Sequence, residues 1–177
     1  MRKIIYYVAC SLDGFIAGEN EDISQFIFEG NGVTKYQNDL KEFDTVIMGR
    51  KTYEFGYKYG LEVGKAAYST MEHYIFSDNL TFENADANVH IKSINLSEIE
   101  KIQAQQGTDI YLCGGGRFAG WLLENKKIDI LKIKLNPILL GKGIKIFGNS
   151  QKSYQLELLQ TESYEKGMQI LTYKILY

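Results

Sequence analysis

The stretch YLCGGGRFAGWLL, residues 111–123, places three consecutive glycines between a strand-like apolar segment and an amphipathic, helix-like one. Glycine has no Cβ, so a backbone of this kind can come close to a bound molecule. The first turn of the following helix offers unpaired N–H groups and a partial positive charge, which favour an anion such as a phosphate. A tight strand-to-helix turn without a ligand explains the same motif. The spacing Gly114, Gly116, Gly120 is not the dinucleotide fingerprint Gly-x-Gly-x-x-Gly.

A second junction of this type follows the apolar segment TVIMG, residues 45–49. Arg50 and Lys51 supply cations there, and Thr52 supplies a hydroxyl, at another predicted helix start. A solvated surface turn is the simpler interpretation of this junction alone. Two such junctions, each after an apolar strand, predict one extended ligand with phosphates at two points, and a dinucleotide fits that description.

A third motif, Ser11-Leu12-Asp13-Gly14, follows the Ile-, Val- and Tyr-rich segment 3–12. Asp-Gly is typical of a turn, so Asp13 is explained by turn formation alone. The functional alternative is a loop that leaves the carboxyl end of a central strand, where open α/β sheets bind their ligands.

Strand-like and helix-like segments alternate along most of the chain. This alternation predicts one α/β domain over residues 1–177, with a mixed, mostly parallel sheet flanked by helices and antiparallel strands at its C-terminal end. Residues 13–31 are expected to form a long loop, and Ser97-Glu98-Ile99-Glu100 predicts a capping box at a helix start. The expected strands are 3–12, 45–49, 73–77, 88–92, 109–113, 129–136, 154–163 and 168–176, and the expected helices include 33–42 and those beginning near 50, 97 and 117.

Composition excludes several function classes. Twenty Lys and Arg residues against 22 Asp and Glu give a net charge of −2, which is unfavourable for binding nucleic acid. No run of 18 apolar residues predicts a transmembrane helix, so we expect no membrane partner. Cys10 and Cys113 are expected to be reduced thiols in the cytoplasm. His73 and His90 are isolated and no metal-ligand spacing occurs, so we expect no metal site.

Taken together and in order, these segments resemble the dihydrofolate reductase-like fold. The resemblance is closest to the family of the C-terminal reductase domain of bacterial riboflavin biosynthesis. It spans roughly residues 3–176 and depends on VACSLDGFIAG (8–18), VIMGRKTYE (46–54), YIFS (74–77), VHIKS (89–93), YLCGGGRFAGWLL (111–123) and LNPILLGKGIKIF (135–147).

The resemblance implies an NADPH-dependent reductase that transfers a hydride to a small polar or heterocyclic substrate. Asp13 would lie near that substrate and is the candidate catalytic residue. The resemblance implies these cofactor-binding positions: Ala9, Ile16 and Ala17 at the nicotinamide; Arg50, Lys51 and Thr52 at the adenosine and phosphates; Ser77 and Lys92 near the adenine ribose; Gly115 and Gly116 at the pyrophosphate; and Gly49, Cys113, Gly114, Arg117 and Phe118 beside them.

The resemblance also implies a homodimer. Apolar stretches alternate with lysines in LKIKLNPILLGKGIKIF, residues 131–147, and an exposed strand or apolar face there would be a liability on a monomer.

Some positions depart from the dihydrofolate reductase pattern. Those enzymes carry an acidic residue in the first helix, and Val33 occupies that position here, with Glu29 nearby but out of register. Ala119 stands where they have a tyrosine. Two alternatives to an efficient reductase therefore stay open: a non-catalytic nucleotide- or ligand-binding module with the same fold, and a weak dihydrofolate reductase.

Overall fold

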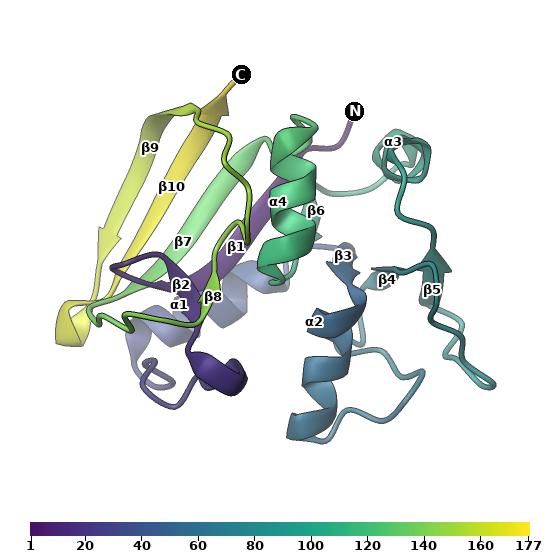
Figure 1. The fold of residues 1–177 in the computed structure, drawn as a ribbon, viewed down its shortest axis with the longest axis horizontal. Coiled ribbons are helices and arrows are strands. Elements are labelled where there is room, and N and C mark those ends of the chain that lie inside the picture. Colours follow the sequence, from purple (N-terminus) through teal and green to yellow (C-terminus); the bar gives the residue numbers. More distant parts are fainter.

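The computed structural model describes residues 1–177 and forms an eight-stranded sheet of order β5-β4-β3-β6-β1-β7-β10-β9 (Figure 1). Its strands are β1 (Ile4–Ser11), β3 (Thr45–Gly49), β4 (Glu72–Phe76), β5 (Val89–Lys92), β6 (Ile110–Leu112), β7 (Ile130–Asn136), β9 (Gln155–Ser163) and β10 (Gln169–Leu176). The helices are α1 (Asn31–Leu40), α2 (Arg50–Phe55), α3 (Leu96–Ala104) and α4 (Gly116–Glu124), with short 3-10 turns at Glu19–Glu21, Gly56–Tyr59 and Glu165–Gly167.

The six strands from β5 to β7 are mutually parallel. β10 then pairs antiparallel with β7, and β9 pairs antiparallel with β10. This confirms the predicted mixed, mostly parallel sheet with antiparallel C-terminal strands. The parallel pairs need crossover connections; α1 to α4 lie in four of them, and residues 77–88 connect β4 to β5 without a helix.

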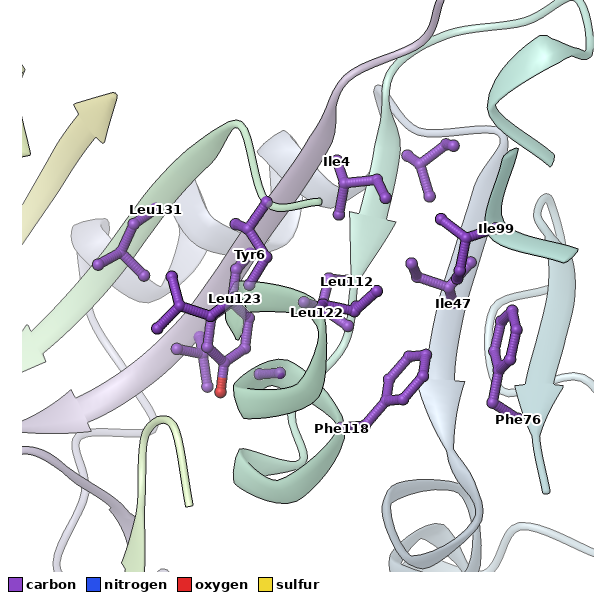
Figure 2. Packing of buried hydrophobic residues seen from close by; sticks show 14 of the residues in the cluster. Ile4, Tyr6, Ile47, Phe76, Ile99, Leu112, Phe118, Leu122, Leu123 and Leu131 are labelled. Atoms are coloured by element: carbon purple, nitrogen blue, oxygen red, sulfur yellow. The ribbon is translucent and has the colours of Figure 1, made fainter. Parts of the chain in front are cut away.

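Helices cover both faces of the sheet. Figure 1 shows α4 in front of the sheet and α1 behind it. Figure 2 shows the α4 side: Phe118 and Leu122 point at the sheet residues Leu112 and Ile47, and Phe118 stacks on Phe76 with ring centroids 4.9 Å apart. A second apolar cluster fills the other face, where Leu40 of α1 and Tyr53 of α2 pack on the sheet.

Alternation along the strands decides which side chain meets which layer. Tyr6 and Val8 of β1 belong to the α4 face, so Tyr7 and Ala9 point to the α1 face. In β7, Leu131 belongs to the α4 face, and Lys132 and Lys134 therefore point towards α1. The two lysines thus enter the interior layer between the sheet and α1.

Two local predictions differ from the structure. Residues 13–31 are not wholly loop, because β2 (Phe15–Ala17) pairs antiparallel with β8 (Ile144–Lys145). The capping box at Ser97 is wrong: α3 begins at Leu96, and Asn95 is its N-cap, whose Oδ1 accepts the Glu98 N–H at 2.9 Å. Asparagine is as good an N-cap as serine, so Asn95, two residues before Ser97, caps the helix instead.

The stretch 131–147, expected to present an exposed strand or apolar face, is exposed at Leu139 and Ile144 but not along β7. β7 is interior to the sheet, between β1 and β10, so its apolar residues are covered. The two edge strands are β5 and β9, and β9 exposes Leu156, Leu158 and Leu159. No helix of this chain has both the length and the apolar character that crossing a membrane requires.

Candidate functional site

A cleft of about 750 Å³ opens where the carboxyl ends of β3 and β6 meet the β2–β8 pair. Its walls are the start of α2, the 114–117 turn, one side of α4, and the segment 143–150 that follows β7. Of the residues predicted to bind the cofactor, it brings together Ile16, Ala17, Lys51, Thr52, Gly114, Gly115, Gly116 and Arg117.

The start of α4 presents free backbone donors to this cleft. Its N-cap is Gly115, with a left-handed φ of 74°, and no side chain caps the helix. The backbone N–H groups of Gly114 and Gly115 have no partner within the protein, and those of Arg117 and Phe118 lie in the first turn of α4, where a helix leaves its N–H groups without intrahelical acceptors. Unpaired donors and the helix dipole together make this turn suited to an anion.

The start of α2 borders the same cleft. Its N-cap is Gly49, again without a capping side chain, and Lys51 and Thr52 lie on the cleft wall. A Cβ on Gly115 would lie only 2.5 Å from Thr52 Oγ1, so the two turns are in close contact. The predicted convergence of the two junctions is therefore present in the fold.

Gly116 and Gly120 of α4 have a packing role that the glycine motif does not predict. A Cβ on Gly116 would overlap the Lys145 carbonyl oxygen and lie 2.9 Å from the Gly148 nitrogen. A Cβ on Gly120 would overlap the Phe147 carbonyl oxygen. These two glycines let the segment 143–150 pack directly on the α4 backbone and so form the cleft wall. The glycine motif predicts room for a ligand beside Gly116, but the segment 143–150 occupies that space.

Three predicted positions extend from the cleft along the carboxyl edge of the sheet. Gly49 pairs with Phe76, Phe76 pairs with Lys92, and the Ser77 N–H donates to the Lys92 carbonyl oxygen at 2.9 Å. Arg50 follows Gly49 in this row, but its Nε contacts Glu54 Oε1 at 2.6 Å. The Lys92 ammonium lies 3.5 Å from Glu98.

Three other predicted residues do not reach the cleft with their side chains. Ala9 and Cys113 point to the α1 face, and the Cys113 thiol lies 3.6 Å from the Tyr68 hydroxyl. Phe118 is buried in the core between Phe76 and Trp121. At positions 113 and 118, only the backbone is available to a ligand in the cleft.

Asp13 is held by hydrogen bonds that link two loops. Its carboxylate accepts from Ser11 Oγ at 2.6 Å, from the Leu140 N–H at 3.1 Å and from the Gly141 N–H at 2.7 Å. The hydroxyl bond from Ser11 and the backbone bonds lower the pKa of this exposed carboxyl. Asp13 is therefore ionised at neutral pH, and its contacts favour the turn-forming interpretation.

Sequence reasoning missed the wall after β7. Lys145, Phe147 and Asn149 line the cleft beside Trp121 of α4. The sequence signal was the glycine-rich run GKGIKIFG, residues 141–148, where Gly141, Gly143 and Gly148 all adopt positive φ. Lys51, Arg117 and Lys145 are the cations of the cleft, and Glu21 and Glu124 are its anions.

Comparison with known proteins supports the fold. The uncharacterised protein YyaP of Bacillus subtilis (strain 168) is 26% identical over 182 residues, 97% of this chain and 94% of that protein. A solved structure of a protein assigned to riboflavin biosynthesis in Shewanella sp. PV-4 superposes with a TM-score of 0.83 at 23% identity, over 100% of both chains.

Dihydrofolate reductase from Enterococcus faecalis, solved with NADP(H), superposes with a TM-score of 0.70 at 14% identity, over 99% of this chain and 97% of that one. At these identities the solved structures show the fold alone, and they confirm the dihydrofolate reductase-like architecture. The family model of the RibD C-terminal domain matches residues 2–170, and the chain belongs to that family.

Proposed function

We propose that this chain is an NADPH-dependent reductase that transfers a hydride to a small polar or heterocyclic substrate, as a single cytoplasmic domain over residues 1–177. The observation that carries the proposal is the convergence of two uncapped helix starts on one cleft, with Lys51 and Arg117 beside them. The RibD C-terminal domain is a reductase-type domain, and the solved structures with this fold include reductases.

The residues of the cleft fit a dinucleotide. The unpaired N–H groups of the 114–118 turn would hold the pyrophosphate, with Thr52 Oγ1 directly across from Gly115. Ile16 and Ala17, on β2, would supply an apolar wall to the nicotinamide. When bound, NADPH supplies the hydride, so the protein needs chiefly to orient the ring against the substrate and to exclude water.

Preference for NADPH over NADH would come from the cations near the carboxyl edge. The ammonium of Lys51 has no carboxylate partner, whereas Arg50 and Lys92 each have one. A 2′-phosphate would compete with Glu54 for Arg50 and bind Lys51 directly. We therefore expect Lys51 to contribute more than Arg50 to the discrimination.

Titration calorimetry with NADPH and NADH tests the proposal. The protein should bind both, and NADPH about tenfold more tightly, which corresponds to roughly 1.4 kcal/mol. Lys51→Ala should remove most of that preference and Arg50→Ala a smaller part. Lys101→Ala, an exposed lysine on α3, is the matched control and should change neither affinity. Absence of binding by both cofactors at millimolar concentration would refute the proposal.

A non-catalytic binding module is the second candidate, and one observation favours it. Asp13, the candidate catalytic residue, is bound to two backbone N–H groups and is ionised at neutral pH, so it is a poor proton donor. A cofactor that binds but loses none of its near-ultraviolet absorbance with pterin, pyrimidine or carbonyl compounds would support this candidate.

We also propose that two copies form a homodimer. Within the expected stretch 131–147, Leu139 and Ile144 are exposed but β7 is interior, and the exposed edge strand on that side is β9. β9 combines unpaired backbone groups at its outer edge with the exposed side chains of Leu156, Leu158 and Leu159. An edge of this kind is a liability on a monomer and a ready surface for pairing.

A further inference from the structure

Lys134 is a buried lysine without a carboxylate partner. Only 5% of the residue is exposed, and its Nζ donates to the Ile27 carbonyl oxygen at 2.8 Å. Its other close neighbour is the Tyr36 ring, whose centroid lies 5.5 Å away. Lys132, two residues earlier on the same face, contacts Asp39 Oδ2 at 2.6 Å. The two neighbouring lysines thus differ in one respect, since only Lys132 has a carboxylate.

A buried, unpaired ammonium is costly to the fold. Burial lowers the pKa of Lys134, as expected for a charge removed from water. The group has three N–H donors, and the protein accepts only one of them. Holding segment 22–31 in place does not require a charge, because Asn136 Oδ1 already accepts the Ile27 N–H at 2.9 Å. The unused donors point to a ligand.

The surroundings of Lys134 are polar and partly open. The Tyr36 and Tyr111 hydroxyls lie 3.2 Å apart, and the Tyr68 hydroxyl lies 3.6 Å from the Cys113 thiol. Ala9 pairs with Lys134 in the centre of the sheet, yet it is only half-buried, as is Cys113. Ala9 and Cys113 therefore keep part of their surface exposed on the α1 face. We call Lys134, Tyr36, Tyr68, Tyr111 and Cys113 the Lys134 cluster.

The Lys134 cluster is adjacent to the proposed cofactor turn. Cys113 directly precedes Gly114, whose backbone lines the cleft. The cluster lies on the α1 face of these strand ends, and α4 lies on the opposite face. A ring held in the cluster and a nicotinamide held in the cleft would therefore meet at the carboxyl ends of β1 and β6.

We propose that Lys134 is a substrate-binding residue that selects a small planar ring carrying a carbonyl or carboxylate oxygen at this position. A protonated lysine only donates hydrogen bonds, so the Lys134 ammonium donates to an oxygen and repels an amino group. Of the carboxylates on this face, Asp39 is bound by Lys132, Lys35 and the Tyr7 hydroxyl, and the Tyr164 hydroxyl donates to Glu162 Oε2. The role of Lys134 in binding a substrate rests on the proposed reductase function, whereas its preference for a ring with an oxygen does not.

The test compares 2-pyridone with 2-aminopyridine at pH 8 without cofactor. The two probes share a single ring and differ in an oxygen or an amino group. Affinities are measured by nuclear magnetic resonance titration of the protein, with lysines labelled at the ε carbon. Lys134 is assigned by the signal missing from Lys134→Met. We expect 2-pyridone to bind about tenfold more tightly and to move the Lys134 signal.

Lys134→Met should abolish the preference, because methionine keeps the volume and removes the charge. Lys174→Met, on the exposed part of β10, is the control and should retain it. Equal binding of the two probes, tighter binding of 2-aminopyridine, or an unmoved Lys134 signal would overturn the proposal. Where Lys134→Met does not fold, the ratio of the two wild-type affinities alone decides the proposal.

The cofactor experiment separates this proposal from the reductase proposal. A preference for 2-pyridone together with no binding of NADPH or NADH would refute the reductase function and leave the Lys134 site standing. Binding of NADPH with no discrimination between 2-pyridone and 2-aminopyridine would refute the Lys134 site and leave the reductase function standing.

Discussion

Replacing Gly120 by alanine sets two opposing effects against each other. Gly120 lies inside α4, where alanine is favoured over glycine by roughly 0.8–1.0 kcal/mol. The new Cβ, however, would overlap the Phe147 carbonyl oxygen and lie 3.2 Å from its carbon, inside the usual 3.5–4.0 Å contact distance. The obstacle is backbone, which cannot rotate away, so the segment 143–150 must move.

The steric cost should exceed the gain in helix propensity, so Gly120→Ala should lower the stability of the protein. Overpacking typically costs about 1–3 kcal/mol, which leaves a net loss of stability of roughly 0–2 kcal/mol after the gain in helix propensity. For a chain of this length each kcal/mol lowers the melting temperature by roughly 2–4 °C. Because the displaced segment lines the cleft, affinity for NADPH should also fall, by about tenfold if the displacement costs 1.4 kcal/mol.

Differential scanning calorimetry and cofactor titration measure both effects. Gly60→Ala is the matched control: Gly60 has a left-handed φ of 89°, and nothing lies within 4 Å of its Cβ position. That variant should lose roughly 1 kcal/mol through backbone strain but keep its affinity for NADPH. A melting temperature for Gly120→Ala that rises by several degrees, as helix propensity alone predicts, would refute the packing argument.

Three further predictions concern other parts of the molecule. Burial raises the pKa of Asp39, but Lys132 and Lys35 lower it by more, so its stabilisation is present above about pH 3.9 and is lost as the pH falls through the lower folded pKa. Asp39→Asn should lower the free energy of unfolding by about 3 kcal/mol at pH 7. In denaturant titrations at several pH values, the variant should also lose less stability than the wild type as the pH falls, and an equal loss would contradict this role for Asp39. With Val33 in place of a carboxylate, dihydrofolate turnover should be at least about tenfold below that of a dedicated enzyme, and efficient saturable turnover in an absorbance assay would disprove this. Light scattering should give twice the 20.2 kDa chain mass, and Leu158→Lys in β9 should give the chain mass itself; a wild-type monomer at micromolar concentration would exclude the dimer.

Much of the fold could be predicted from local patterns in the sequence. The segment 45–49 was expected as a strand and forms β3 with the same bounds, because its apolar run ends at a glycine and a charged pair. The turns at Gly49–Thr52 and Gly114–Arg117 were predicted for a similar reason, since glycines and cations at a strand end are local signals.

The cleft wall formed by residues 143–150 depends on contacts between segments that are far apart in the sequence. Positions 116 and 120 require glycine because the segment 143–150, about 30 residues further along the chain, packs against the backbone of α4 there. The pattern of residues within α4 does not predict that contact. Asp13 likewise links two loops because its carboxylate accepts hydrogen bonds from the N–H groups of Leu140 and Gly141. Motif spacing identified these residues but not what they touch.

Lys134 is the clearest case of a property that only the tertiary structure decides. In the sequence, Lys132 and Lys134 alternate with apolar residues and suggest a solvated face. The alternation in β7 is real, but the register that pairs Ala9 with Lys134 turns the lysine face inwards, under α1 and segment 22–31. Periodicity determines that one face of a strand is polar. Whether that face meets water or the interior depends on which layers the rest of the chain folds against it, because burial is a property of the packed assembly.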